Sequence, residues 1–204
     1  MSMKLILITS PTFLPGEAEA IEACLSAGVS FIHLRKPEAS ESEVEALVRA
    51  IPPTCYDRLI VHDHFALQAR FGLGGIHLNG RHPHPPVGYQ GRLTRACHSL
   101  SEVAESQGHF DYVLLSPLFD SISKQGYRAA YTPEALVQAR QEGIIDERVV
   151  ALGGISLSRL PQVRQWGFGG AALLGDVWGR YHTPTDLPAV TSHLRQLLHV
   201  CHHT

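Results

Sequence analysis

Short apolar runs recur along the whole chain, and each is followed by a helical segment or a polar loop. We expect eight strands, at residues 4–9, 29–34, 58–62, 75–78, 93–97, 112–115, 148–152 and 170–174. The runs are continuously apolar, which is typical of parallel strands that are buried on both faces. Eight such alternations within 204 residues predict an α/β fold, a small single-domain (β/α)8 TIM barrel.

The segments between these runs carry helix signals. We expect helices at residues 16–27, 40–51, 65–71, 99–107, 132–141, 157–166 and 186–201. Ser40 and Ser99 each precede a glutamate by three residues, which is a capping box, and Thr132 stands before Pro133 at the first helical position. A doubly wound open sheet is the alternative. It normally has a Gly-rich turn after its first strand, where this chain reads Thr-Ser-Pro-Thr-Phe from Thr9.

Composition limits the function classes. Hydrophobic residues make up 44% of the chain, and the net charge is -2 with histidine neutral. No basic block is present, so nucleic acid is not an expected partner. No composition shift divides the chain, and we expect one domain over residues 1–204. Three histidines (His199, His202 and His203) lie in the C-terminal tail, which we expect to be frayed from about residue 200.

Targeting signals are also missing from the sequence. No run of about 18 apolar residues is present, so we expect no transmembrane helix and no membrane partner. The N-terminus leads directly into the first strand without the pattern of a signal peptide. The four cysteines form no Cys-x-x-Cys pair and are interpreted as reduced, mostly buried thiols of a cytoplasmic protein.

The polar loop at residues 116–126 follows the sixth strand. In an extended loop, Ser121, Ser123 and Lys124 can converge on one small anion, because alternate side chains point to one side. We interpret the loop as a phosphate or diphosphate site, and an ordinary solvated loop is the alternative. In a barrel of this kind the active site lies at the C-terminal strand ends, where this loop begins.

Other strand ends supply further candidates. Arg35, after the second strand, can bind anionic oxygens bidentately; a salt bridge at the barrel rim is the alternative. Glycines after the last two strands allow backbone N–H groups to approach a phosphate, or else only make tight turns; they are Gly153, Gly154 and Gly175. Asp63, after the third strand, is a candidate Mg²⁺ ligand, and capping of the next helix is the alternative.

Histidines gather at the same strand ends, at positions 33, 62, 64, 77 and 98. The sequence shows no His-x-x-x-His pair with a third ligand, so it does not favour a zinc site. His77 lies inside a strand and is interpreted as a core residue with its hydrogen bonds satisfied. His98 precedes a helix and could orient a neighbouring group.

Taken in order, these strand ends resemble the thiamine phosphate synthase family and its relatives, the TenI-like thiazole tautomerases. The carrying segments read Ile-His-Leu-Arg-Lys from Ile32, Val-His-Asp from Val61, Gly-Gly-Ile-His-Leu from Gly74 and Ala-Cys-His-Ser from Ala96. The segment from Asp111 through Ser-Pro-Leu-Phe-Asp-Ser-Ile-Ser-Lys is the most specific, and Val-Ala-Leu-Gly-Gly-Ile at 150–155 completes the set. The resemblance covers nearly the whole chain.

The resemblance implies an enzyme that joins hydroxymethylpyrimidine diphosphate to thiazole phosphate, with Mg²⁺, and releases pyrophosphate in thiamine biosynthesis. It implies a catalytic set of Arg35, Lys124 and Asp63, with Asp63 as the metal ligand. The implied substrate-binding residues are His33, Arg35, His62, His98, Ser121, Ser123, Lys124, Gly153, Gly154 and Gly175. The partners are then small phosphorylated thiazole and pyrimidine compounds, with a homo-oligomer possible.

Several positions differ from the family's pattern. The family usually has glutamine at His33 and asparagine at His62, and its second Mg²⁺ aspartate would fall near Arg81 or His82. The tautomerases carry a catalytic histidine where Pro117 stands. Synthase activity is the leading expectation. A thiazole tautomerase, and a non-catalytic thiazole phosphate-binding or regulatory barrel, are the alternatives.

Overall fold

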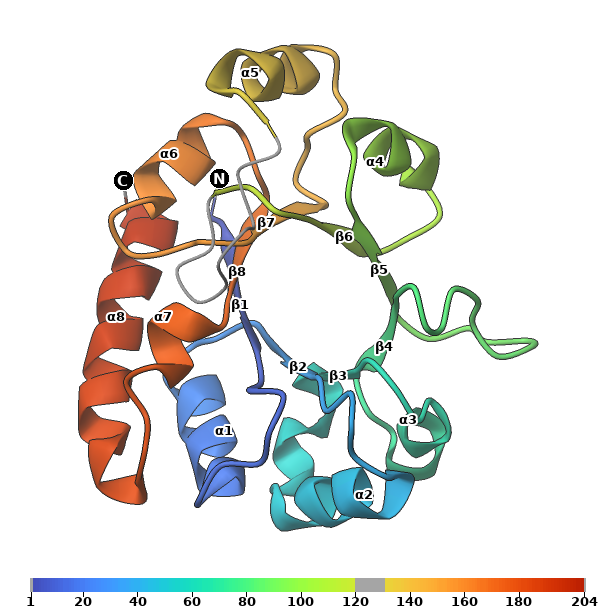
Figure 1. The fold of residues 1–204 in the computed structure, drawn as a ribbon, viewed down its shortest axis with the longest axis vertical. Coiled ribbons are helices and arrows are strands. Elements are labelled where there is room, and N and C mark those ends of the chain that lie inside the picture. The colour runs from blue at the N-terminus through green and yellow to red at the C-terminus, as the bar shows by residue number, and fades with distance from the viewer. Residues whose placement is uncertain (1, 120–130, 204) are drawn as a thin grey trace.

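The computed structural model describes residues 2–119 and 131–203. Eight parallel strands form a closed barrel in sequential order, and the helices lie around it (Figure 1). The strands are β1 (Lys4–Ile8), β2 (Phe31–Leu34), β3 (Leu59–Val61), β4 (Gly75–Leu78), β5 (Leu93–Cys97), β6 (Tyr112–Leu115), β7 (Val149–Leu152) and β8 (Gly170–Leu173). The expected (β/α)8 barrel is confirmed, and the open-sheet alternative is excluded because β1 pairs with both β2 and β8.

Several helices begin where the sequence places caps. The helices are α1 (Glu17–Ser26), α2 (Glu41–Ala50), α3 (Ala66–Phe71), α4 (Leu100–Ser106), α5 (Pro133–Gln141), α6 (Leu160–Gln165), α7 (Gly175–Trp178) and α8 (Leu187–His203), with short 3₁₀ turns η1 (Pro53–Arg58) and η2 (Pro184–Asp186). Ser40 and Glu43 form the expected capping box of α2, and Thr132 caps α5 through the backbone N–H of Ala135. No sequence signal predicts α7, which is only four residues long.

The inside of the barrel is divided into two halves of different chemistry. One half is apolar, with a buried cluster of Ile6, Ile8, Tyr112, Leu114, Val150 and Ala172 from β1, β6, β7 and β8. The other half, on β2 to β5, buries polar side chains: His33, His62, His77 and Thr94. Buried polar groups of this kind need hydrogen-bond partners, and the described part of the chain holds no buried side-chain nitrogen or oxygen without one.

The C-terminal segment is ordered, which corrects the expectation of a frayed tail from about residue 200. Helix α8 continues to His203, and Cys201 is completely buried. The apolar stripe of the helix extends to that residue, which explains why the last turn packs on the barrel. The guanidinium of Arg164 donates to the carbonyl oxygens of Val200 and Cys201, and Met3 N–H donates to the Cys201 carbonyl at 3.0 Å.

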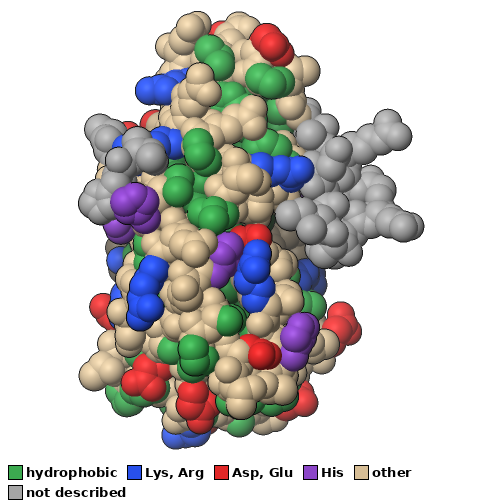
Figure 2. Space-filling view, turned by 90° about the vertical axis from the view of Figure 1, so that its left-hand side faces the viewer, with side chains coloured by type: hydrophobic (Ala, Val, Ile, Leu, Met, Phe, Trp, Pro, Cys, Tyr) green, Lys and Arg blue, Asp and Glu red, His purple; other side chains and the backbone are tan. Residues whose placement is uncertain are grey.

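On the face shown in Figure 2, basic and acidic side chains are interspersed without a block of one sign. Among residues 2–119 and 131–203, no helix combines the length and hydropathy needed to span a bilayer.

Candidate active site

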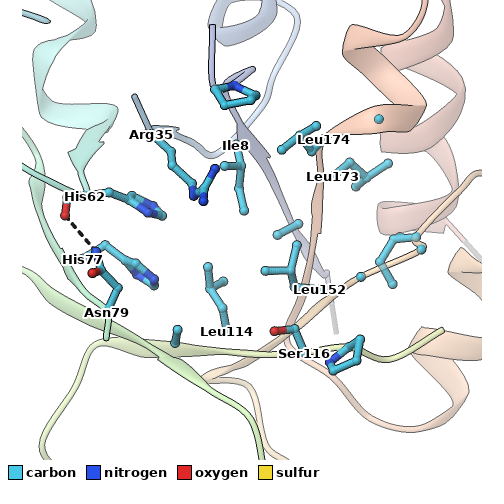
Figure 3. Close-up of a pocket in the computed structure, with 18 of the residues that line it drawn as sticks. Ile8, Arg35, His62, His77, Asn79, Leu114, Ser116, Leu152, Leu173 and Leu174 are labelled. Atoms are coloured by element: carbon cyan, nitrogen blue, oxygen red, sulfur yellow. Dashed lines mark hydrogen bonds between the residues drawn. The ribbon is translucent and has the colours of Figure 1, made fainter. Parts of the chain in front are cut away.

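A cavity of about 610 Å³ opens at the C-terminal ends of the strands. Its walls come from both halves of the barrel (Figure 3). The polar side carries Arg35, His62, His77 and Asn79, and the apolar side carries Ile8, Leu114, Leu152 and Leu173. The cavity thus has an apolar floor with polar groups at its edge, which is the usual composition of a small-molecule site.

Arg35 lies in the wall of this cavity and its guanidinium points inward (Figure 3). Its backbone is held by Thr9, whose Oγ1 accepts from Arg35 N–H at 2.9 Å and donates to the Arg35 carbonyl at 3.3 Å. Because β1 and β2 are neighbouring strands, this pair of hydrogen bonds joins their two C-terminal ends. The predicted anion-binding position of Arg35 is therefore compatible with the structure.

The adjacent Lys36 has a different environment. Its ammonium donates to both carboxylate oxygens of Glu17 and to the carbonyl oxygens of Ser10 and Thr12, within 2.6–2.9 Å. Burial lowers the pKa of Lys36 and raises that of Glu17, and the ion pair opposes both shifts. Lys36 is absent from the cavity wall, so of these two basic residues only Arg35 faces the site.

Asp63, the candidate Mg²⁺ ligand, is already in contact with Arg81 and His82. Arg81 donates to both of its carboxylate oxygens at 2.9 and 3.2 Å, and His82 Nε2 lies 3.2 Å from Oδ1. Asn79 supports this arrangement, because its Oδ1 accepts from the backbone N–H groups of Arg81 and His82. Mg²⁺ prefers carboxylate oxygens and retained waters. A lone carboxylate paired with a guanidinium does not fit that preference, so Asp63 is not arranged to hold a magnesium ion while Arg81 is bound to it.

The opposite wall is built from glycine turns. Gly153 and Gly154 follow β7 with φ of 98° and 64°, and Gly175 follows β8; all three line the cavity. The segment after β6 packs on this turn, since Phe119 N–H donates to the Gly153 carbonyl at 3.1 Å. A side chain at Gly153 would meet the Pro117 backbone at 2.9 Å, which explains why glycine is needed there.

His98 and Ser116 form the edge between these two walls. Both line the cavity, and His98 Nδ1 lies 3.3 Å from the Ser116 carbonyl oxygen. The backbone of His98 is fixed on both sides, because its N–H donates to Glu102 and its carbonyl accepts from the Tyr131 hydroxyl at 2.8 Å. The expected orienting position of His98 is consistent with these contacts.

The predicted anion site in the loop after β6 consists of Ser121, Ser123 and Lys124. These three residues lie outside the described residues. Sequence reasoning assigned no binding role to five polar residues of the wall: His77, Asn79, Arg81, Ser116 and Asp176. The available signal was their position near the C-terminal ends of strands: His77 lies in β4, and the others lie within three residues after β4, β6 or β8. Asp176 is paired with His193, whose Nε2 lies 2.7 Å from its carboxylate.

The histidines of β2, β3 and β4 are closer together than their positions in the sequence suggested. His33 Nδ1 lies 2.8 Å from His62 Nε2, and the rings of His62 and His77 stack with centroids 4.1 Å apart. His33 Nε2 also reaches the Tyr112 hydroxyl at 2.7 Å, across the inside of the barrel. The predicted binding residue His62 lines the cavity, whereas His33 lies behind it.

A closed barrel with a cavity at the C-terminal strand ends defines a (β/α)8-barrel protein whose cavity lies where the active sites of such barrels are found. The family model described as thiamine monophosphate synthase matches residues 5–177 of this chain. The chain therefore belongs to that family, as its strand ends indicated, and it is a thiamine phosphate synthase-like transferase.

Individual relatives support the same family assignment. The thiamine-phosphate synthase of Syntrophomonas wolfei is 26% identical over 204 residues, covering 95% of each chain, and that of Rhodospirillum centenum is 30% identical, covering 86% of this chain and 89% of its own. The crystal structure of thiamine phosphate pyrophosphorylase from Bacteroides thetaiotaomicron superposes with a TM-score of 0.87 at 40% identity, covering 97% of each chain.

Proposed function

We propose that this enzyme couples hydroxymethylpyrimidine diphosphate to thiazole phosphate and releases pyrophosphate, in thiamine biosynthesis. The observation that supports this most directly is the two-sided cavity. Arg35 and Arg81 stand at one edge, the turns at Gly153 and Gly175 form the other, and an apolar floor lies between them. Two phosphorylated rings that point in opposite directions match this layout. The phosphate groups then lie at the two edges of the cavity, and the flat rings lie on its apolar floor.

The diphosphate is assigned to the edge formed by Arg35, with Ser121, Ser123 and Lys124 of the loop after β6 as further proposed partners. A guanidinium fork suits two anionic oxygens, and the lysine adds a compact charge. Departure of pyrophosphate leaves a cation on the pyrimidine methyl carbon. Groups that hold the growing negative charge on the leaving oxygens therefore lower the barrier.

The thiazole phosphate is assigned to the glycine turns at Gly153, Gly154 and Gly175. Positive φ values at the first two let the backbone approach an anion without a Cβ in the way. The thiazole nitrogen then attacks the cation, and no protein nucleophile is required. His62 and His98 are proposed to contact the rings from the polar side.

Magnesium is proposed from the family resemblance, with Asp63 as its ligand once the Arg81 side chain has moved off the carboxylate. The coupling assay is therefore run with and without Mg²⁺. The four cysteines are free and buried, in keeping with the cytoplasmic setting that we propose.

The test is pyrophosphate release from both substrates together, with and without millimolar Mg²⁺. Wild-type protein is expected to release pyrophosphate only when both substrates are present. Arg35→Gln is expected to lower kcat/KM about 100-fold, as for loss of one charged donor to a developing anion. Arg195→Gln, on the exposed face of α8, is the matched control and should retain activity. Binding of thiazole phosphate without pyrophosphate release would replace the proposal with a non-catalytic barrel.

A further inference from the structure

Three imidazole rings occupy one side of the barrel interior. The side chains of His33, His62 and His77 are almost completely buried, and each offers a nitrogen within 4.8 Å of the others. Burial lowers the pKa of His77 to about 3 and holds the pKa of the other two well below the usual range. These shifts favour the neutral ring, which is the form in which histidine binds metals.

The tautomer of His77 follows from its partner. The hydroxyl of Thr94 lies 3.2 Å from the Ile76 carbonyl, which can only accept a hydrogen bond. We infer that Thr94 donates its one hydrogen there and accepts from His77 Nδ1, which is 2.8 Å away. Nδ1 then carries the proton of the neutral ring, and Nε2 keeps a free lone pair. His77 lines the cavity, and the described residues give Nε2 no hydrogen-bond partner.

His33 and His62 complete the cluster. The hydroxyl of Tyr112 lies 2.7 Å from His33 Nε2. In the tautomer of His33 that suits a metal ligand, Nε2–H donates a hydrogen bond to this hydroxyl, and Nδ1 is unprotonated, facing His62 Nε2 at 2.8 Å. Without a metal, the hydrogen between these two nitrogens belongs to His62 Nε2. When a metal ion binds between them, that proton moves to His62 Nδ1, so that each ring stays neutral and no proton leaves the cluster.

We propose that His33, His62 and His77 form a three-histidine site for a divalent transition-metal ion of the Zn²⁺ type, with its open coordination position facing the cavity. Three neutral protein ligands and one open position are the pattern of catalytic zinc sites. Outer hydrogen bonds from ligand rings to fixed oxygens are also typical of such sites. Tyr112 and Thr94 supply them here.

Metal binding requires a modest rearrangement. Zinc–nitrogen bonds of about 2.0–2.1 Å in a tetrahedron place the nitrogens about 3.3 Å apart. The three nitrogens lie within 4.8 Å, and the planes of His62 and His77 differ by 26°. One of these two rings must turn so that both lone pairs meet at one point.

The charges around the cluster select the fourth ligand. Burial is the largest cause that lowers the pKa of His62, followed by the neighbouring His77 and His33 and then by Arg35 and Arg81. Asp63 compensates the charge of Arg81, so Arg35 is the guanidinium left to disfavour a bare dication and to favour one that carries an anionic oxygen. We therefore expect the open position to take phosphate or hydroxide, so that phosphate and the metal strengthen each other's binding.

The three-histidine site does not depend on the proposed function and is tested without either substrate. Protein freed of metal with a chelator is titrated with Co²⁺ and Zn²⁺. We expect one ion per chain, micromolar or tighter, with visible Co²⁺ bands of a tetrahedral nitrogen site and no thiolate charge-transfer band. Inorganic phosphate should raise the Co²⁺ affinity about tenfold.

Variants separate the cluster from surface histidines. His77→Gln should lower Co²⁺ affinity at least about 100-fold, and Thr94→Val should lower it by about 10–100-fold while leaving all three ligands in place. His109→Gln, at an exposed position, is the matched control and should bind as wild type does. His33→Gln and His62→Asn are second variants if His77→Gln does not fold. No stoichiometric binding, or binding that Thr94→Val and the cluster variants leave unchanged, would overturn the proposal.

Discussion

The ammonium of Lys36 lies 2.6 Å from Oε1 of Glu17, and the two side chains are only 1% and 2% exposed. This ion pair is enclosed between the first two βα loops and α1, and the Ser10 and Thr12 carbonyl oxygens accept the remaining lysine protons. The pair therefore fixes the backbone on which the neighbouring Arg35 is held. Its loss would affect both the stability of the barrel and the position of a site residue.

Lys36→Met is expected to reduce the free energy of unfolding by about 3–5 kcal/mol, because it leaves the Glu17 carboxylate buried without a cationic partner. Urea unfolding followed by circular dichroism measures the change. The double variant Glu17→Gln with Lys36→Met removes both charges and should recover a substantial part of the loss. If the double variant were less stable than Lys36→Met, a buried unpaired charge would not be the cause.

Asp63 and Arg81 give a second prediction. Arg81→Asp replaces the guanidinium with a second carboxylate beside Asp63, and two adjacent carboxylates are relieved by a bound cation. Mg²⁺ affinity measured by calorimetry is expected to rise about tenfold or more above wild type. Adding Asp63→Asn should remove the gain. An unchanged Mg²⁺ affinity in Arg81→Asp would show that the two side chains do not share a site.

Gly153 allows a prediction that separates crowding from backbone strain. Gly153→Ala places a Cβ 2.9 Å from the Pro117 backbone at a φ of +98°. Gly108→Ala has a comparable φ of +78° but meets nothing within 4 Å. We expect Gly153→Ala to lose about 1–3 kcal/mol more stability than Gly108→Ala, and to weaken thiazole phosphate binding. If chemical denaturation showed the same loss of stability in both variants, backbone strain alone would explain the effect of Gly153→Ala.

Asp186 supplies a pH-dependent prediction. Its carboxylate accepts from the backbone N–H groups of His182 and Thr183, which holds its pKa below the ordinary value of 3.8. A lowered folded-state pKa stabilises the protein above the unfolded-state pKa, and this is lost as pH falls through the folded value. Asp186→Asn should therefore be less stable than wild type at neutral pH, with the difference shrinking as pH falls below 3.8. A difference that persists in acid would point to lost hydrogen bonds instead.

Much of the fold could be predicted from local sequence, because each strand is a short apolar run and several helices begin at caps. The eight strands differ from expectation by at most two residues at either end. The end of α8 was misjudged, since tail histidines suggested fraying while the burial of Cys201 depends on contacts with distant residues. Pairing of β1 with β8, which closes the barrel, is likewise a contact between the two ends of the chain.

The site was less predictable. Arg35 and the glycines were found because they directly follow strands. The different environments of Arg35 and Lys36 depend on where Glu17 lies, which no local pattern shows. The histidine cluster depends on the register of three strands: Val61 pairs with Ile76, so the residues that follow them come together. Arg81 meets Asp63 only across two loops, and the sequence therefore suggested a metal ligand where the structure has an ion pair.

The hydrogen bond between Met3 N–H and the Cys201 carbonyl joins the residue just before β1 to the last turn of α8. The cavity, by contrast, opens at the C-terminal strand ends. A short linker could therefore join residue 3 to residue 201, and new chain ends could be placed in the exposed connection between β4 and β5. Such a circular permutant would keep every strand pairing of the barrel. We therefore expect it to form the same barrel and the same cavity, although its strands are synthesised in a different order.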